Sequence, residues 1–238
     1  MTILVTGSSG GVGSAVLRKL KSEGVSCLGL DLVDSSSHPT VKANLADLSE
    51  LEKVSLPSDF GAITGIVHSA AHQPLGKIWE LSSEDWLSSF TVNVLSLQTL
   101  TSRFRQDLID SRGTVVAISS VHAKATSTGM SAYAASKSAL ESWIRSSAIE
   151  YGSSVSFVGI SLGAVDTPKL REGLQRWPED ERRERLERLV ARTPAGYVAS
   201  AEEIASRIFS ILQDGNASYF TGNCLPLDGG VSARLASE

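Results

Sequence analysis

The sequence predicts an α/β fold in which helices cover both faces of a doubly wound parallel sheet. Short β-rich runs alternate with amphipathic segments along the chain, the pattern of parallel strands joined by helical crossovers. The runs at residues 3–5 and 114–118 are apolar almost throughout, as in strands covered on both sides. No repeat, low-complexity tract or Pro/Gly-rich linker breaks the alternation, so we expect residues 1–238 to form one domain.

Six predicted strands follow in order along the chain. They are ILVTG from residue 3, VSCLGLD from 25, GIVHSA from 65, GTVVAISS from 113, VSFVGISLG from 155 and NCLPLDGG from 223. Helical spacing between them is clearest in two sets of apolar residues: Val12, Val16, Leu17 and Leu20, and Ile204, Ile208, Ile211 and Leu212.

One segment near residue 177 differs from the other predicted helices. WPEDERRERLERLVAR has Pro178 in its first turn, acids early and arginines late, which complements the helix dipole at both ends. Its only apolar stripe is Leu186, Leu189 and Val190, so it can pack only lightly. We expect residues 169–195 to cover a substrate site; a solvated surface helix is the alternative.

Composition points to small-molecule chemistry. The net charge of −4 and the absence of a basic cluster argue against a nucleic-acid partner. No apolar run approaches the ~18 residues of a membrane span, and no signal peptide precedes the first strand, so we expect a cytoplasmic protein without a membrane partner. The two cysteines, Cys27 and Cys224, form no CxxC pattern, and the histidines lack companions at zinc-ligand spacing, so no metal is expected.

A glycine-rich loop follows the first predicted strand directly. The segment TGSSGGVG, from Thr6 to Gly13, would bring backbone N–H groups and a helix N-terminus to a dinucleotide's pyrophosphate. Asp31 ends the second strand 18 residues later, near the ~20-residue interval at which a carboxylate meets the adenosine ribose. That carboxylate would repel a 2′-phosphate, so NAD is expected rather than NADP. Alternatively, Asp31 simply opens the DLVDSSS turn.

These motifs and those that follow resemble the short-chain dehydrogenase/reductase (SDR) family, from residue 1 to about residue 231. The family's TGxxxGxG pattern falls on the glycine loop, and EEIA and TGNCLPLDGG are similar to its last helix and strand. Its catalytic asparagine, serine, tyrosine and lysine correspond to Asn93 in TVNVLS, Ser120 in AISS, and Tyr133 and Lys137 in SAYAASKSAL. The resemblance implies a Rossmann-like fold and alcohol/carbonyl redox chemistry.

The resemblance also implies a set of cofactor contacts. In it, Val165 would reach the nicotinamide carboxamide and Thr167 the phosphates. The implied contacts are Thr6, Gly7, Ser9, Gly11, Val12, Gly13, Asp31, Asn44, Leu45, Ser69, Ala70, Tyr133, Lys137, Gly163, Val165 and Thr167. The chain departs from the family at HSAA from His68, where NNAG is usual; at Leu162 and Gly163, where PG is usual; and at Asn44, where an acid often caps the adenine.

The tyrosine and lysine are spaced for acid/base chemistry. A free phenol with a pKa near 10 is a poor base at neutral pH, and an offset of four residues places Lys137 on the same helical face as Tyr133. The ammonium is expected to lower the phenol pKa and to reach the nicotinamide ribose. Ser120, at the end of a strand, is expected to hold the substrate oxygen. By resemblance, Asn93 would order a helix backbone and a relay water.

Several alternatives remain open. An NADP-dependent 3-oxoacyl thioester reductase and a non-catalytic, cofactor-sensing family member are the rivals; a sugar-nucleotide epimerase would need a larger C-terminal domain. The resemblance implies a homotetramer or dimer, with Ala134, Ala135, Ser138 and Ala139 permitting close helix packing. The sequence does not decide whether His72, His122, Arg171 and Arg176 meet the substrate.

Overall fold

The computed structural model describes residues 2–35, 37–213 and 217–234; Met1 and residues 235–238 of the predicted domain lie outside them. One sheet of seven parallel strands has the order β3-β2-β1-β4-β5-β6-β9. The strands are β1 (Thr2–Thr6), β2 (Cys27–Asp31), β3 (Thr40–Lys42), β4 (Ile63–His68), β5 (Thr114–Ser120), β6 (Ser156–Leu162) and β9 (Cys224–Leu227). This confirms the predicted doubly wound, Rossmann-like α/β fold.

All six predicted β-rich runs contain a strand of this sheet. β1 is buried at all five positions, and β5 and β6 at every position but the first, so near-continuous apolar runs form the sheet centre. The sequence did not predict β3, whose three residues are only partly buried at the sheet edge. A second, two-stranded sheet pairs β7 (Val165–Asp166) with β8 (Ala199–Ser200), and it too was not predicted.

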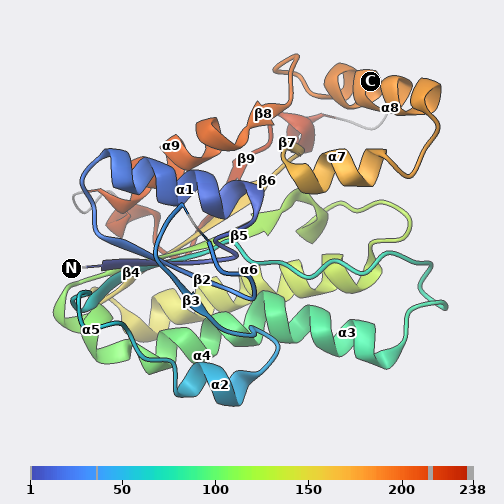
Figure 1. The fold of residues 1–238 in the computed structure, drawn as a ribbon. Helices are drawn as coiled ribbons and strands as arrows, with labels where there is room; N and C mark the ends of the chain where they lie inside the picture. Colours follow the sequence, from blue (N-terminus) through green and yellow to red (C-terminus); the bar gives the residue numbers. More distant parts are fainter. Residues whose placement is uncertain (1, 36, 214–216, 235–238) are drawn as a thin grey trace.

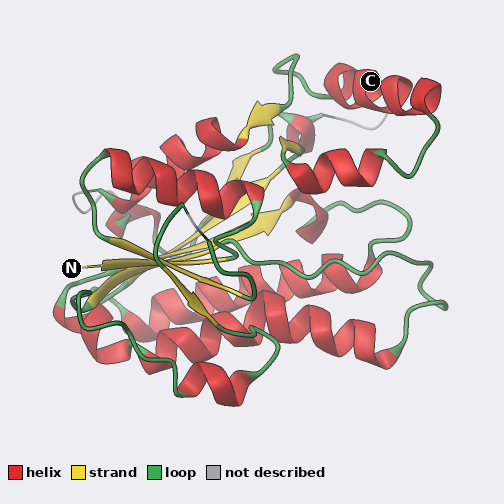
Figure 2. Ribbon diagram, viewed as in Figure 1, coloured by secondary structure: helices red, strands yellow, loops and turns green. Residues whose placement is uncertain are grey.

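Helices cover both faces of the large sheet (Figures 1 and 2). On one face lie α1 (Gly11–Ser22) and α9 (Ala201–Leu212). The other face carries α2 (Leu48–Glu52), α3 (Ser83–Phe90), α4 (Ser96–Arg103), α5 (Arg105–Asp110) and α6 (Ser131–Tyr151). A π-helical turn, Thr91–Leu95, joins α3 to α4. None of the described helices is both long and apolar enough to span a membrane.

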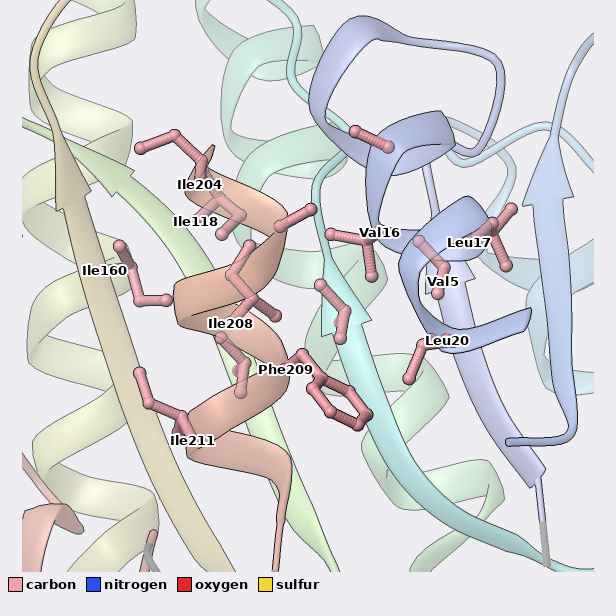
Figure 3. Close-up of a cluster of buried hydrophobic side chains, with 14 of the residues drawn as sticks. Val5, Val16, Leu17, Leu20, Ile118, Ile160, Ile204, Ile208, Phe209 and Ile211 are labelled. Carbon is pink, nitrogen blue, oxygen red and sulfur yellow. The ribbon is translucent and has the colours of Figure 1, made fainter. Parts of the chain in front are cut away.

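The two predicted apolar stripes meet in the core beneath α1 and α9 (Figure 3). Val16 and Leu20 of α1 and Ile204 and Ile208 of α9 are each at most 3% exposed and pack with β-strand residues such as Val5. Burying a side chain of this size contributes about 1.5–3 kcal/mol. This packing fixes α1, and with it the loop between β1 and α1, against the sheet.

The predicted cover segment forms two helices, α7 (Pro168–Leu174) and α8 (Glu179–Arg192), which lie together at one end of the molecule in Figure 1. Pro178 stands at the N-cap of α8, one position before the expected first turn, with three acids following it. Neither helix has a buried residue. The segment is therefore held lightly, as its short apolar stripe predicts.

Candidate active site

The loop between β1 and α1 has a conformation that requires glycine. Gly7 has φ +64°, and a Cβ on it would lie 2.7 Å from the backbone of Ala70. A Cβ on Gly13 would lie 2.2 Å from the carbonyl oxygen of Gly7. The first glycine therefore permits the turn and contact with the segment after β4, and the last lets α1 approach the loop closely.

A cavity of about 440 Å³ opens at this loop, at the carboxyl ends of the strands where the strand order reverses. Ten residues of the implied cofactor set line it: Gly7, Ser9, Gly11, Val12, Asp31, Asn44, Leu45, Ser69, Ala70 and Thr167. Six others are not among its lining residues: Thr6, Gly13, Tyr133, Lys137, Gly163 and Val165. Lys169, which the sequence assigned no role, also lines it.

Asp31 lies in the wall of this cavity and braces the glycine loop. Its Oδ2 accepts a hydrogen bond from the backbone N–H of Ser9 at 2.9 Å, and its Oδ1 accepts one from Val33 at 3.3 Å. The parallel pairing of β2 and β3 sets exposed Lys42 in register with Asp31. Sequence inspection missed this cation because it is 11 positions away along the chain and only strand pairing brings the two together.

Lys137 lies on α6 and is 1% exposed. Its Nζ donates a 2.7 Å hydrogen bond to the carbonyl oxygen of Ile118, the β5 residue that lines the cavity. Burial, and secondarily the positive charge of Lys169, lowers the pKa of Lys137 to about 7. A buried ammonium with one carbonyl partner is costly, so the charged and neutral forms of this side chain are both populated near pH 7.

Tyr133 and Ser120 come together as the spacing predicted. A hydrogen bond with Ser120 lowers the pKa of Tyr133, but the larger effect of burial raises it. The expectation that Lys137 depresses this pKa is therefore not met in this structure; the Nζ lies 5.7 Å from the centroid of the Tyr133 ring and bonds Ile118 instead. The Ser120 hydroxyl also accepts a 3.2 Å bond from the N–H of His122.

Asn93 occupies the π-helical turn and is fully buried. Its Oδ1 accepts from the N–H of His72 at 2.8 Å, and its Nδ2 donates to the carbonyl oxygen of His72 at 2.9 Å and to the Ser136 hydroxyl at 2.8 Å. The side chain therefore holds the segment after β4 against α6, the helix that carries Tyr133 and Lys137. The backbone that it orders is that of this loop.

His68, the first departure from the NNAG pattern, is fully buried and is not among the cavity-lining residues. Its Nδ1 is hydrogen bonded to Thr6 Oγ1 at 2.8 Å, and that hydroxyl also accepts from the N–H of Ala70. Burial, followed by the charge of Lys137, lowers the pKa of His68 to about 3. The imidazole is thus neutral and joins the end of β4 to the end of β1, while the Thr6 hydroxyl holds the segment after β4.

The four undecided residues separate into different surroundings. His72 lines the cavity, whereas the His122 ring packs edge-on against Tyr133 at 6.0 Å between centroids and bonds Thr126 at 3.0 Å. Arg171 makes two 2.8 Å hydrogen bonds to Asp166, and Arg176 is exposed. No cluster of three or more metal-ligating side chains occurs in the part of the chain that the structure describes.

Comparison with known proteins supports one family throughout. A family model described as "Enoyl-(Acyl carrier protein) reductase" matches residues 7–232. The chain is 29% identical to the 3-oxoacyl-[acyl-carrier-protein] reductase of Pseudomonas aeruginosa, covering 96% of both chains. It is 30% identical to the 2,3-dihydro-2,3-dihydroxybenzoate dehydrogenase of Escherichia coli, covering 96% of this chain and 95% of the other.

A solved structure shows the same likeness in three dimensions. The ligand-free aldohexose dehydrogenase of Thermoplasma acidophilum superposes with a TM-score of 0.90 at 25% identity, covering 99% of this chain and 95% of the other. With the glycine loop, the Ser-Tyr-Lys arrangement and the family match, the chain belongs to the short-chain dehydrogenase/reductase family of oxidoreductases. The enzymes of this family act on CH–OH groups with a nicotinamide cofactor.

Proposed function

We propose that this protein is an NAD-dependent oxidoreductase that interconverts a secondary alcohol and a ketone, with Tyr133 as general acid/base. The observation that carries the proposal is the hydrogen-bonded pair of Ser120 and Tyr133 beside buried Lys137, at the carboxyl end of β5 and next to the cavity. Each of these side chains meets a requirement of hydride transfer at a carbinol carbon.

The glycine loop and the cavity fit a dinucleotide. Gly7, Gly10 and Gly11 of the loop line the cavity without a side chain, so backbone can approach a pyrophosphate closely there. When bound, the nicotinamide supplies the hydride acceptor or donor. Asp31, Asn44 and Ser69 would hold its adenosine half and Thr167 its phosphates, as cavity-lining residues.

The protein's own side chains would transfer the proton and hold the substrate oxygen in place. The Ser120 hydroxyl would donate to the substrate oxygen, while Tyr133 would take the proton of that oxygen as a phenolate or return it as a phenol. A Lys137 with a pKa near 7 can exchange a proton with the phenol at neutral pH without the cost of a fixed buried charge. Asn93 would position the segment after β4 through His72 and helix α6 through Ser136. We propose that α7 and α8 cover the substrate.

The test is a screen of NAD against NADP with secondary alcohols, sugars, steroids and hydroxy acids, following absorbance of the reduced nicotinamide. Turnover with NAD should be clearly preferred. Tyr133→Phe should lose at least about 100-fold in kcat, the lower range for general acid–base catalysis. If the variant keeps most of its activity, Tyr133 is not the acid/base.

Asp31→Ser tests the cofactor preference. Losing a carboxylate that bonds a ribose should reduce kcat/KM with NAD about 10- to 100-fold, because hydrogen bonds to charged groups contribute about 1.5–3 kcal/mol. Activity with NADP should rise or stay level, since the repulsion is removed. Asp34→Asn, an exposed acid in the following turn, is the matched control.

A second candidate is an NADP-dependent 3-oxoacyl thioester reductase, favoured by the relative of that name in Pseudomonas aeruginosa. Lys42, in register with Asp31, is the cation that would serve a 2′-phosphate in this case. Preferential oxidation of NADPH by an acetoacetyl thioester, lost in Lys42→Met, would establish it. Tight cofactor binding without turnover on any substrate would instead support the cofactor-sensing alternative.

We also propose a homo-oligomer. Leu87 of α3, Leu95 of the π-helical turn and Ile149 of α6 are exposed apolar side chains on the outer helical layer. Two of the predicted packing residues are already engaged within the chain: Ala134 is buried, and Ser138 donates to the carbonyl oxygen of Ala123. Light scattering at micromolar concentration should give a dimer or tetramer, and a monomer would contradict the proposal.

A further inference from the structure

Lys169 is the second residue of α7 and belongs to the wall of the dinucleotide-sized cavity. The same wall contains Thr167, whose side chain lies against the glycine loop: a Cβ built on Gly11 would be 2.6 Å from Thr167 Cγ2. The start of α7 is therefore next to the glycine loop, and Lys169 lines the cavity close to that loop.

The charge of Lys169 acts on Lys137, which lies under the cavity. It lowers the pKa of Lys137, whose Nζ bonds the carbonyl oxygen of Ile118. Lys169 is itself an exposed residue of the cavity wall, so its ammonium is open to solvent and to an anion in the cavity. Partial desolvation lowers its own pKa.

Lys169 has no acidic partner among the described residues. No ion pair within 4.0 Å or side-chain hydrogen bond involves it in the ranges 2–35, 37–213 and 217–234, and the acid that raises its pKa is Glu172, one turn along α7. Arg171, by contrast, is paired with Asp166 on the surface. The charged residues that line the cavity are Asp31, which bonds two backbone N–H groups, and Lys169.

We propose that Lys169 is an anion-binding residue of this cavity and pairs with the diphosphate of the bound dinucleotide. The inference rests on the proposed function for its ligand. Lys169 is the one cationic side chain in the described wall of this cavity, and a diphosphate beside the glycine loop would supply the anion that it lacks within the described chain. A carboxylate or phosphate group on the substrate could bind Lys169 in the same way. Binding measurements with cofactor fragments distinguish an anion of the cofactor from an anion of the substrate.

The experiment is isothermal titration calorimetry of Lys169→Gln and Lys169→Arg with NAD, ADP-ribose and adenosine. Lys169→Gln should weaken NAD and ADP-ribose roughly tenfold, the effect of one charged hydrogen bond, and leave adenosine, which lacks the diphosphate, unchanged. Lys169→Arg should retain most of the affinity. Added NaCl should weaken ADP-ribose binding less in Lys169→Gln than in the parent protein.

Arg171→Gln is the matched control on the same helix, and its dinucleotide affinity should equal that of the parent. An equal loss for adenosine would overturn the proposal, because the pocket as a whole would then have changed. Unchanged NAD and ADP-ribose affinities would also overturn it; a raised KM for acidic substrates alone would then assign the anion to the substrate. Binding needs no turnover, so this result is independent of whether any alcohol is oxidised.

Discussion

Helices α6 and α8 both carry several charged residues, but they use them in opposite ways. α6 takes Lys137 and Glu141 into the interior, where they are 1% and 4% exposed. Each has a partner on β5: the carbonyl oxygen of Ile118 for the lysine and the Ser119 hydroxyl, at 2.9 Å, for the glutamate. Partners on another element fix the position of α6.

Several charges of α8 pair with one another along its own surface. Arg188 pairs with Glu184 and Arg185 with Glu181, each one turn apart, and the helix has no buried residue. Such pairs stabilise the helix itself but do not attach it to the rest of the protein. The comparison shows how one chain builds a firmly held helix beside the candidate active site and a lightly attached surface helix, the proposed cover, from similar residue types.

The largest expected effect is at the junction that supports the α6 wall. Asn93→Ala removes three buried hydrogen bonds and leaves the backbone groups of His72 and the Ser136 hydroxyl with fewer partners. The free energy of unfolding should fall by about 2–4 kcal/mol, measured by urea denaturation. Asn223→Ala, an exposed asparagine bonded only within its own turn, should change it by less than about 0.5 kcal/mol. Equal losses in the two variants would contradict this role.

The next effect concerns the buried charge of α6. The pKa of Lys137 is about 7 in the folded protein and about 10.5 in the unfolded chain. Between these values the unfolded state binds more protons, so stability should rise with pH, by at most about 1.4 kcal/mol per pH unit. Lys137→Met should remove this rise and be more stable than the parent at pH 7.

Thermal unfolding of both proteins from pH 7 to 10 measures the difference. Arg145→Met, on the exposed face of the same helix, is the control and should retain the parental pH dependence. Parallel stability curves for Lys137→Met and the parent would show that the lysine remains charged when buried.

Much of the fold, and the difference between α6 and α8, could be predicted from the sequence. Strand and helix periodicity predicted the sheet, because long apolar runs and 3.6-residue stripes are local signals. β3 was missed because its three residues, TVK, become a strand only by pairing with β2. The light packing of α8 was predicted because its apolar stripe is short.

The sequence predicted which residues belong to the candidate site better than it predicted the contacts between them. The spacing of Ser120, Tyr133 and Lys137 identified the group, but the raised pKa of Tyr133 depends on burial by distant segments. The positions of His68 and Lys169 were not deducible from local sequence, since one depends on a contact with Thr6 and the other on the placement of the start of α7 beside the cavity. Long-range contacts decide such features.

A smaller effect tests the buried histidine that joins the ends of β1 and β4. The pKa of His68 is about 3 in the folded state and about 6.5 in the unfolded chain, so acidification across this window favours unfolding. His68→Asn should lose less stability than the parent between pH 6.5 and pH 5, by about 1.7 kcal/mol. Urea denaturation at the two pH values measures it, and a slope equal to that of the parent would contradict a buried, neutral His68.

The smallest effect is expected on the cover. A double-mutant cycle on Arg188 and Glu184 of α8, using Gln at each position, should give a coupling energy below about 0.5 kcal/mol, because both side chains are more than half exposed. The same cycle on Ser119 and Glu141, using Ala and Gln, should give about 1 kcal/mol or more, since that bond is buried. The contrast between α6 and α8 depends on this difference: if the two coupling energies are equal, burial and an external partner do not fix α6 more firmly than surface pairs fix α8.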